Sequence, residues 1–131
     1  RAAMIYRSKT ESIEHKLQSG CVKWFRAQYS RFALNLFAVP NGAKRSKKER
    51  KDKKEEGLTA GVADMILLVP STKHHGLCIE FKREKTETTR RTYQEPEQKE
   101  WQKAVEAQGY RYEVVRTFEQ FYDIVTDYMR E

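Results

Sequence analysis

Residues 64–82 read DMILLVPSTKHHGLCIEFK, and this stretch decides the fold. The run MILLV at residues 65–69 is apolar throughout, a pattern typical of a buried strand. Residues 70–76 form a polar segment with proline and glycine, and LCIEFK at residues 77–82 predicts a second strand. The stretch therefore predicts a buried β-hairpin.

Helical and extended patterns continue on both sides of this hairpin. Pro96 stands where a helix can begin, and Gly109 stands where that helix would end. The predicted elements are a helix at 10–29, a strand at 32–39, a helix at 96–108, a strand at 110–116 and a helix at 118–130. This order predicts an α/β fold with a mixed sheet and helices on both faces. The 131 residues fit one domain, 1–131.

The chain is basic, and the charge is unevenly distributed. Its 26 Lys and Arg exceed its 19 Asp and Glu, which gives a net charge of +7. Residues 110–131 carry a net charge of −2, so the preceding residues carry +9. An excess of this size suggests a polyanionic partner, with nucleic acid first.

The densest charge lies in a basic insert at residues 43–57, with eight Lys or Arg and four Asp or Glu. It lacks an apolar stripe, so it is either an exposed helix or a mobile basic loop. Its residues from Lys44 to Lys54 could contact a DNA backbone, although a solvated run of charges would have the same composition.

The cysteines, the apolar runs and the histidines indicate where the protein works and which kinds of site it lacks. Cys21 and Cys78 lie in apolar patterns without metal-ligand spacing, which indicates two reduced core thiols in a cytoplasmic protein. No apolar run is long enough for a transmembrane helix, so we expect no membrane partner. His74 and His75 lie in the polar turn, where exposure to solvent is a simpler expectation than a transition-metal site.

Three charged residues flank or interrupt the apolar hairpin. Glu80 and Lys82 share one face of their strand because strand side chains alternate. A turn centred near Lys73 would place Asp64 across from Lys82 and diagonal to Glu80, about 7–8 Å from it. The set is either a structural ion pair or a site for a hard cation.

A Mg²⁺ site would suit these residues. Asp64 and Glu80 supply carboxylates, and the backbone carbonyl of Phe81 could add a third oxygen ligand. Such a metal activates water against a phosphodiester, and Lys82 could orient that water or stabilise charge on the phosphate.

Short motifs occur in a fixed order between residues 14 and 110. They are EHxxQ from Glu14, VPNGAKRS from Val39, GxxxGVAD from Gly57, GLCIEFK from Gly76, PEQKxW from Pro96 and QGY from Gln108. Together they resemble the VRR-Nuc family of the PD-(D/E)xK nuclease superfamily, in its stand-alone phage or bacterial form. One departure is Ala63, where the family usually has proline.

The resemblance implies a restriction-endonuclease-like fold and phosphodiester hydrolysis with Mg²⁺ or Mn²⁺. It implies that Glu14, Asp64, Glu80, Lys82 and Gln98 converge on one catalytic site, with Glu14 as a further metal ligand and Gln18 as support. The candidate DNA-binding residues are Asn41, Lys44, Arg45, Lys47, Lys48, Arg50 and Lys51.

The expected substrate and oligomeric state rest on the resemblance more than on any single residue. A stand-alone domain has one active site, and symmetric cutting of a four-way junction needs two, which a two-fold dimer supplies. We therefore expect a structure-selective DNA endonuclease that resolves Holliday junctions as a homodimer, in a bacterial or phage-infected cytoplasm. The alternatives are a nuclease acting on flaps, nicked duplex or single strands, and a non-catalytic DNA-binding module.

Overall fold

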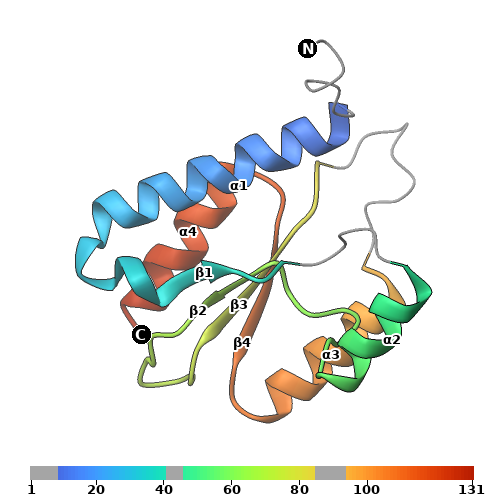
Figure 1. The fold of residues 1–131 in the computed structure, drawn as a ribbon. Helices are drawn as coiled ribbons and strands as arrows, with labels where there is room; N and C mark the ends of the chain where they lie inside the picture. The colour runs from blue at the N-terminus through green and yellow to red at the C-terminus, as the bar shows by residue number, and fades with distance from the viewer. Residues whose placement is uncertain (1–8, 41–45, 85–93) are drawn as a thin grey trace.

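The computed structural model describes residues 9–40, 46–84 and 94–131, and Figure 1 shows a sheet with helices on both of its faces. The sheet consists of β1 (Leu36–Ala38), β2 (Met65–Leu67), β3 (Leu77–Phe81) and β4 (Arg111–Val115), in that order. The pairs β1–β2 and β2–β3 are antiparallel, whereas β3 and β4 are parallel. The predicted mixed sheet and the predicted hairpin are confirmed.

The helices form two layers. In Figure 1, α1 (Lys9–Gln28) and α4 (Phe118–Met129) lie to the left of the sheet, and α3 (Pro96–Ala107) lies to the right of it. The third helix connects the two parallel strands, as such a crossover requires. Within the described part of the chain, no helix has the length and apolarity needed to cross a membrane.

Each layer buries its own set of side chains, because alternate strand residues point to opposite faces. On one face α1 and α4 pack on the sheet through Cys21, Phe25, Phe121, Val125 and Tyr128, among others. On the other face α3 packs through Trp101 and Val105 against Ala63, Cys78 and Tyr112. Both cysteines are buried free thiols, as their apolar patterns predict.

The predicted strand at 32–39 is mostly wrong. A 3₁₀ helix, η2 (Ser30–Asn35), occupies its first part, and β1 keeps only three residues. The chain turns directly after α1, with Phe32 N donating to Tyr29 O at 2.8 Å. The link to the sheet continues through Asn35, whose Nδ2 donates to Leu68 O at 2.9 Å. The backbone of Asn35 also takes part, since its O accepts from Leu68 N at 2.8 Å.

The basic insert is helical where it is described. Helix α2 (Lys47–Glu55) has no buried residue, which confirms the exposed-helix alternative. Ser46 starts it with a capping box, in which Ser46 Oγ accepts from Glu49 N and Glu49 Oε1 accepts from Ser46 N. Residues 41–45 lie outside the described residues, and so does most of the loop predicted at 83–95, residues 85–93.

A glycine sets the path of the segment between α2 and β2. Gly61 has a positive φ of 85°, and a Cβ at this position would overlap the backbone carbonyl of Glu97 in the first turn of α3. The segment therefore lies directly against α3, three residues before Asp64.

We expect Gly61→Ala to destabilise the fold by about 3 kcal/mol or more, because an alanine adds a backbone clash to the strain of a positive φ. Gly57→Ala is the matched control: its φ is 106°, but open space surrounds the added Cβ. The free energy of unfolding of Gly57→Ala should fall by about 1–2 kcal/mol. Chemical unfolding of both variants measures the difference, and equal losses would contradict the tight approach to α3.

Candidate active site

Asp64 and Glu80 lie directly opposite each other on neighbouring strands. Met65 pairs with Ile79, so the next pair outward is Asp64 and Glu80. The predicted turn centre at Lys73 is therefore wrong, and with it the placement of Asp64 across from Lys82. Ser71 explains the difference, because its Oγ accepts from both Lys73 N and His74 N and fixes a different turn.

Asp64 is held in place by the backbone of β3. Its Oδ2 accepts a hydrogen bond of 2.7 Å from Phe81 N. Phe81 is also the residue whose backbone carbonyl is predicted to bind the metal. The aspartate therefore stands at the carboxyl end of β3, next to Glu80.

Glu80 is the one buried charged residue in the described part of the chain, with 4% of its surface exposed. Its Oε2 accepts from Gln98 Nε2 at 2.9 Å and lies 3.8 Å from Lys82 Nζ. Its Oε1 is buried and has no hydrogen-bond partner among the described residues. An unpartnered carboxylate oxygen in a protein interior is unfavourable by about 1–3 kcal/mol.

The two carboxyl groups disturb each other's protonation. Burial raises the pKa of Glu80, and the negative charge of Asp64 raises it further, while Lys82 lowers it. Burial also raises the pKa of Asp64, against the opposing hydrogen bond from Phe81. The pair therefore binds a proton more readily than separate carboxylates do, and a cation between them would relieve the same repulsion.

Gln98 is oriented toward Glu80 by the start of α3. Its Oε1 accepts from Glu95 N at 2.9 Å, as the third helical residue does in a capping box. With its oxygen engaged there, the amide presents Nε2 to Glu80. The structure thus places Asp64, Glu80, Lys82 and Gln98 together, with Gln98 as a positioning group.

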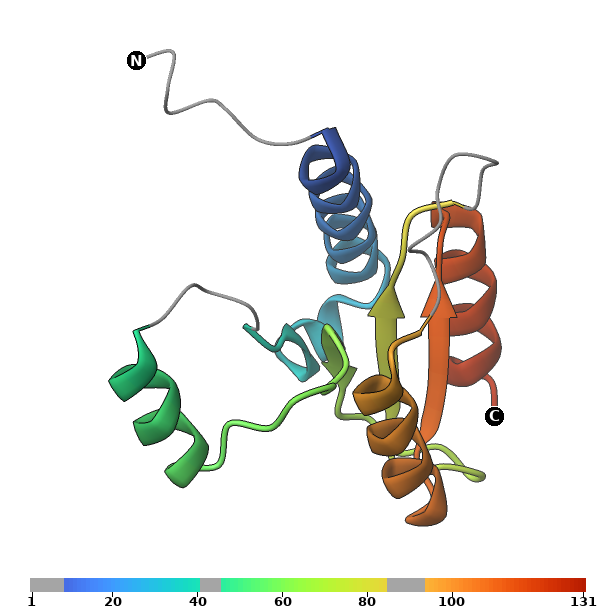
Figure 2. The same ribbon diagram turned by 90° about the vertical axis from the view of Figure 1, so that its right-hand side faces the viewer.

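A cleft of about 420 Å³ opens over this pair. In Figure 2, α2 and α3 lie apart from each other, and the segment before β2 runs from α2 to the sheet. Arg50 and Lys54 line the cleft from α2, and Glu95 and Glu97 line it from α3. The cleft therefore has one basic wall and one acidic wall above the carboxylates.

The sequence anticipates part of this lining. Lys54, within the run that could contact a DNA backbone, lines the cleft beside Arg50, which lies four residues earlier on the same helix face. Leu58 also lines the cleft, and no sequence pattern singled it out. Lys47, Lys48 and Lys51 are exposed on α2 outside the cleft lining. Asn41, Lys44 and Arg45 lie outside the described residues.

Two residues of the first helix are not brought into the cleft. Glu14 is half-buried on α1, and the described cleft lining does not include it. Gln18 lines a separate surface hollow on α1. Accordingly, no three His, Cys, Asp or Glu side chains of the described residues gather where they could hold a metal ion.

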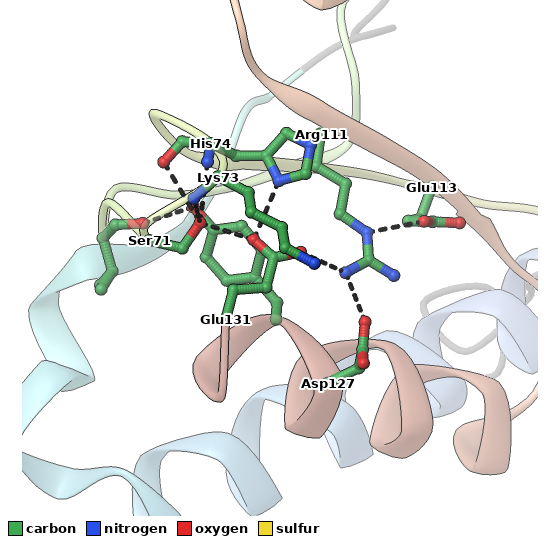
Figure 3. Close-up of polar contacts among 9 residues, drawn as sticks. Ser71, Lys73, His74, Arg111, Glu113, Asp127 and Glu131 are labelled. Atoms are coloured by element: carbon green, nitrogen blue, oxygen red, sulfur yellow. Dashed lines mark hydrogen bonds and ion pairs between the residues drawn. The ribbon is translucent and has the colours of Figure 1, made fainter.

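His74 belongs to a polar cluster at the other end of the sheet (Figure 3). Its Nδ1 lies 2.9 Å from Glu131 Oε1, which also accepts from Ser71 Oγ. Arg111 Nη1 lies 3.0 Å from Glu131 Oε2 and 2.8 Å from Asp127 Oδ2. His74 is half-buried, so its predicted exposure is wrong, and the cluster ties the end of α4 to the β2–β3 turn.

Comparisons with known proteins agree with this architecture. The model of the VRR-NUC domain matches residues 3–119. A solved VRR_NUC domain protein has a TM-score of 0.74 with this chain and 22% identity to it, covering 95% of this chain and 92% of that one. At this identity the likeness shows the fold, and curated proteins give no match. Since the family model covers most of the sequence, the chain belongs to the VRR-NUC family of nuclease-type, DNA-processing domains.

Proposed function

We propose that this chain is a Mg²⁺- or Mn²⁺-dependent DNA endonuclease whose metal is held by Asp64 and Glu80. One observation carries the proposal: Glu80 keeps a buried Oε1, unpartnered among the described residues, beside a second carboxylate on the floor of a cleft. Such an oxygen is poorly placed for a purely structural ion pair but well placed to bind a hard cation.

The donor set fits a Mg²⁺ ion. Two carboxylates and the Phe81 carbonyl are oxygen donors, and Mg²⁺ commonly fills its remaining positions with water. The proposed set leaves out Glu14, because no three His, Cys, Asp or Glu side chains of the described residues gather at one metal site. When bound, a divalent cation polarises a phosphodiester and makes a bound water more acidic.

The surrounding side chains have distinct roles in this proposal. Lys82 Nζ, 3.8 Å from Glu80 Oε2, can donate to a phosphate oxygen and stabilise its charge. Gln98 keeps Glu80 in one orientation through its Nε2. Arg50 and Lys54 attract the DNA backbone to the α2 side of the cleft, and Glu95 and Glu97 repel it from the α3 side.

We further propose a branched substrate and a homodimer. Two active sites related by a two-fold axis could cut both strands of a four-way junction symmetrically. Flaps, nicked duplexes and single strands are the alternative substrates. A panel of all four DNAs in Mg²⁺ and in Mn²⁺ tests the preference, and a strict monomer by light scattering, with and without DNA, would count against the dimer.

We expect Asp64→Ala and Lys82→Ala to abolish cleavage of that panel, while DNA affinity falls by no more than about threefold, since phosphate contacts dominate binding. Asp123→Ala and Lys103→Ala are matched controls, because both residues are exposed and lie outside the cleft lining. Undiminished cleavage by either site variant would show that the catalytic site is elsewhere. Binding without cleavage by the wild type would favour a non-catalytic module.

The raised pKa of Glu80 predicts how the metal-free protein responds to pH. The folded state holds a proton that the unfolded state releases, so this stabilisation is complete below the ordinary glutamate pKa. It is lost as the pH rises through the raised pKa, which is about 8. In EDTA, the Tm of the wild type should therefore fall as the pH rises from the ordinary glutamate pKa through the raised one.

Glu80→Gln should flatten this pH dependence and stabilise the metal-free protein above the raised pKa by about 1–3 kcal/mol. Mg²⁺ should raise the Tm of the wild type at that alkaline pH and leave that of Glu80→Gln unchanged. The exposed Glu100→Gln is the control, with wild-type behaviour in both experiments. A destabilised Glu80→Gln protein at alkaline pH would contradict the buried charge repulsion.

Neutralising the exposed face of α2 should weaken DNA binding and reduce its salt dependence. The slope of log affinity against log salt should fall by about 0.9 for each phosphate that the variant no longer neutralises. The variant replaces Lys47, Lys48, Arg50 and Lys51 with glutamine. The control replaces an equal number of exposed cations outside the cleft lining, namely Lys73, Lys99, Lys103 and Arg130. Equal slopes for the two variants would exclude a specific role of α2.

A further inference from the structure

A leucine stands in the charged cleft without a place in the core. Leu58 lines the cleft together with Asp64 and Glu80, and 38% of its surface is exposed. It belongs to neither hydrophobic cluster of the described residues. Exposed leucines are common on protein surfaces, so exposure alone does not indicate a function. The local backbone of Leu58 provides the further evidence.

The backbone of Leu58 is fixed by the end of α2. Leu58 N donates to Lys53 O at 2.8 Å, and Gly57 N donates to Lys54 O at 3.0 Å. With Gly57 at a φ of 106°, these two bonds form a Schellman motif. In this motif the residue after the glycine usually packs on an apolar residue in the last turn of its helix.

Helix α2 provides no such residue. Its sequence is KKERKDKKE, so every side chain in it is charged. The motif therefore holds Leu58 at a defined position where its own helix offers nothing apolar to cover it. Leu58 nevertheless lines the same cleft as Arg50 and Lys54, although it lies beyond the end of their helix.

Together these three lining residues match the chemistry of one nucleotide strand. Arg50 and Lys54 suit phosphates, and Leu58 offers an apolar surface to a base or sugar beside them. Glu95 and Glu97 on the opposite wall favour the same orientation, with phosphates toward α2. A protein partner fits less well, because the centres of protein interfaces are depleted of charged residues, whereas charges surround Leu58.

We propose that Leu58 packs against an unstacked nucleotide next to the phosphate at the Asp64–Glu80 pair. In a continuous duplex the base faces are covered by their neighbours, so this packing requires a base that has left the stack. DNA with unpaired or loosely stacked bases provides that base at lower cost. Leu58 thereby selects distorted DNA over continuous duplex, a role that rests on the proposed nuclease function.

The first test compares cleavage of two DNAs of identical sequence context, one fully paired and one with a central unpaired bulge, in Mg²⁺. Leu58→Ala should lower the ratio of kcat/KM for bulged over paired DNA by about tenfold, as expected when one side chain no longer packs on a base. Leu58→Met should keep the ratio within about twofold, because methionine has a similar apolar volume. An unchanged ratio for Leu58→Ala, or an equal decrease on both DNAs, would overturn the proposal.

Leu34→Ala is the matched control, since Leu34 is 94% exposed and lies outside the cleft lining. A shift in the ratio for this control as large as that for Leu58→Ala would also overturn the proposal. The second measurement needs no cleavage. In EDTA, bulged DNA with 2-aminopurine in the bulge should become more fluorescent when the wild type or Leu58→Met binds, because the base leaves the stack.

Binding by the wild type without a fluorescence change would show that the base stays stacked, against the proposal. Failure of the wild type to cleave any DNA in Mg²⁺ or Mn²⁺ would instead refute the proposed nuclease function. In that case the fluorescence measurement in EDTA still decides the role of Leu58, because the increase should be lost when Leu58→Ala binds the same DNA.

Discussion

The half-buried carboxylate of Asp64 and the buried carboxylate of Glu80 lie next to each other at the carboxyl end of β3, and the remaining architecture keeps them there. Their proximity is unfavourable, because burial and mutual repulsion both oppose ionisation. Three independent restraints maintain it: the β2–β3 register, the hydrogen bond from Phe81 N to Asp64, and the amide of Gln98 on Glu80. The first two act where β2 meets β3, and the third comes from a side chain of α3.

At the opposite end of the sheet, charged side chains are paired with side chains of opposite charge. There Arg111 pairs with Glu113, Asp127 and Glu131. Although burial acts to raise the pKa of Glu131, hydrogen bonds from Ser71 and His74 lower it. The five residues of β3 span about 16 Å between the two ends. The paired charges at this end thus contrast with the unfavourable carboxylate pair at the other.

The sequence was sufficient for the parts of the fold that depend on local pattern. Apolar runs predict β2 and β3, and Pro96 and Gly109 bound α3 because proline and glycine constrain the backbone directly. The prediction was wrong where tertiary contacts override pattern, as in the 3₁₀ helix at Ser30–Asn35. It was also wrong in the hairpin register, since hydrogen bonds to Ser71 Oγ set the turn and no periodicity reveals them.

In the candidate site, too, local sequence pattern predicts some neighbours, and tertiary packing determines the others. Strand alternation could place Glu80 beside Lys82, but only the packing of α3 shows that Gln98 Nε2 reaches Glu80. The same capping box that starts α3 fixes the amide, so one residue serves helix formation and the site at once. A glutamate at this position could still accept from Glu95 N and cap the helix, yet it would place a third carboxylate beside the pair. The requirement for a donor toward Glu80 therefore selects glutamine here, beyond what the helix start alone requires.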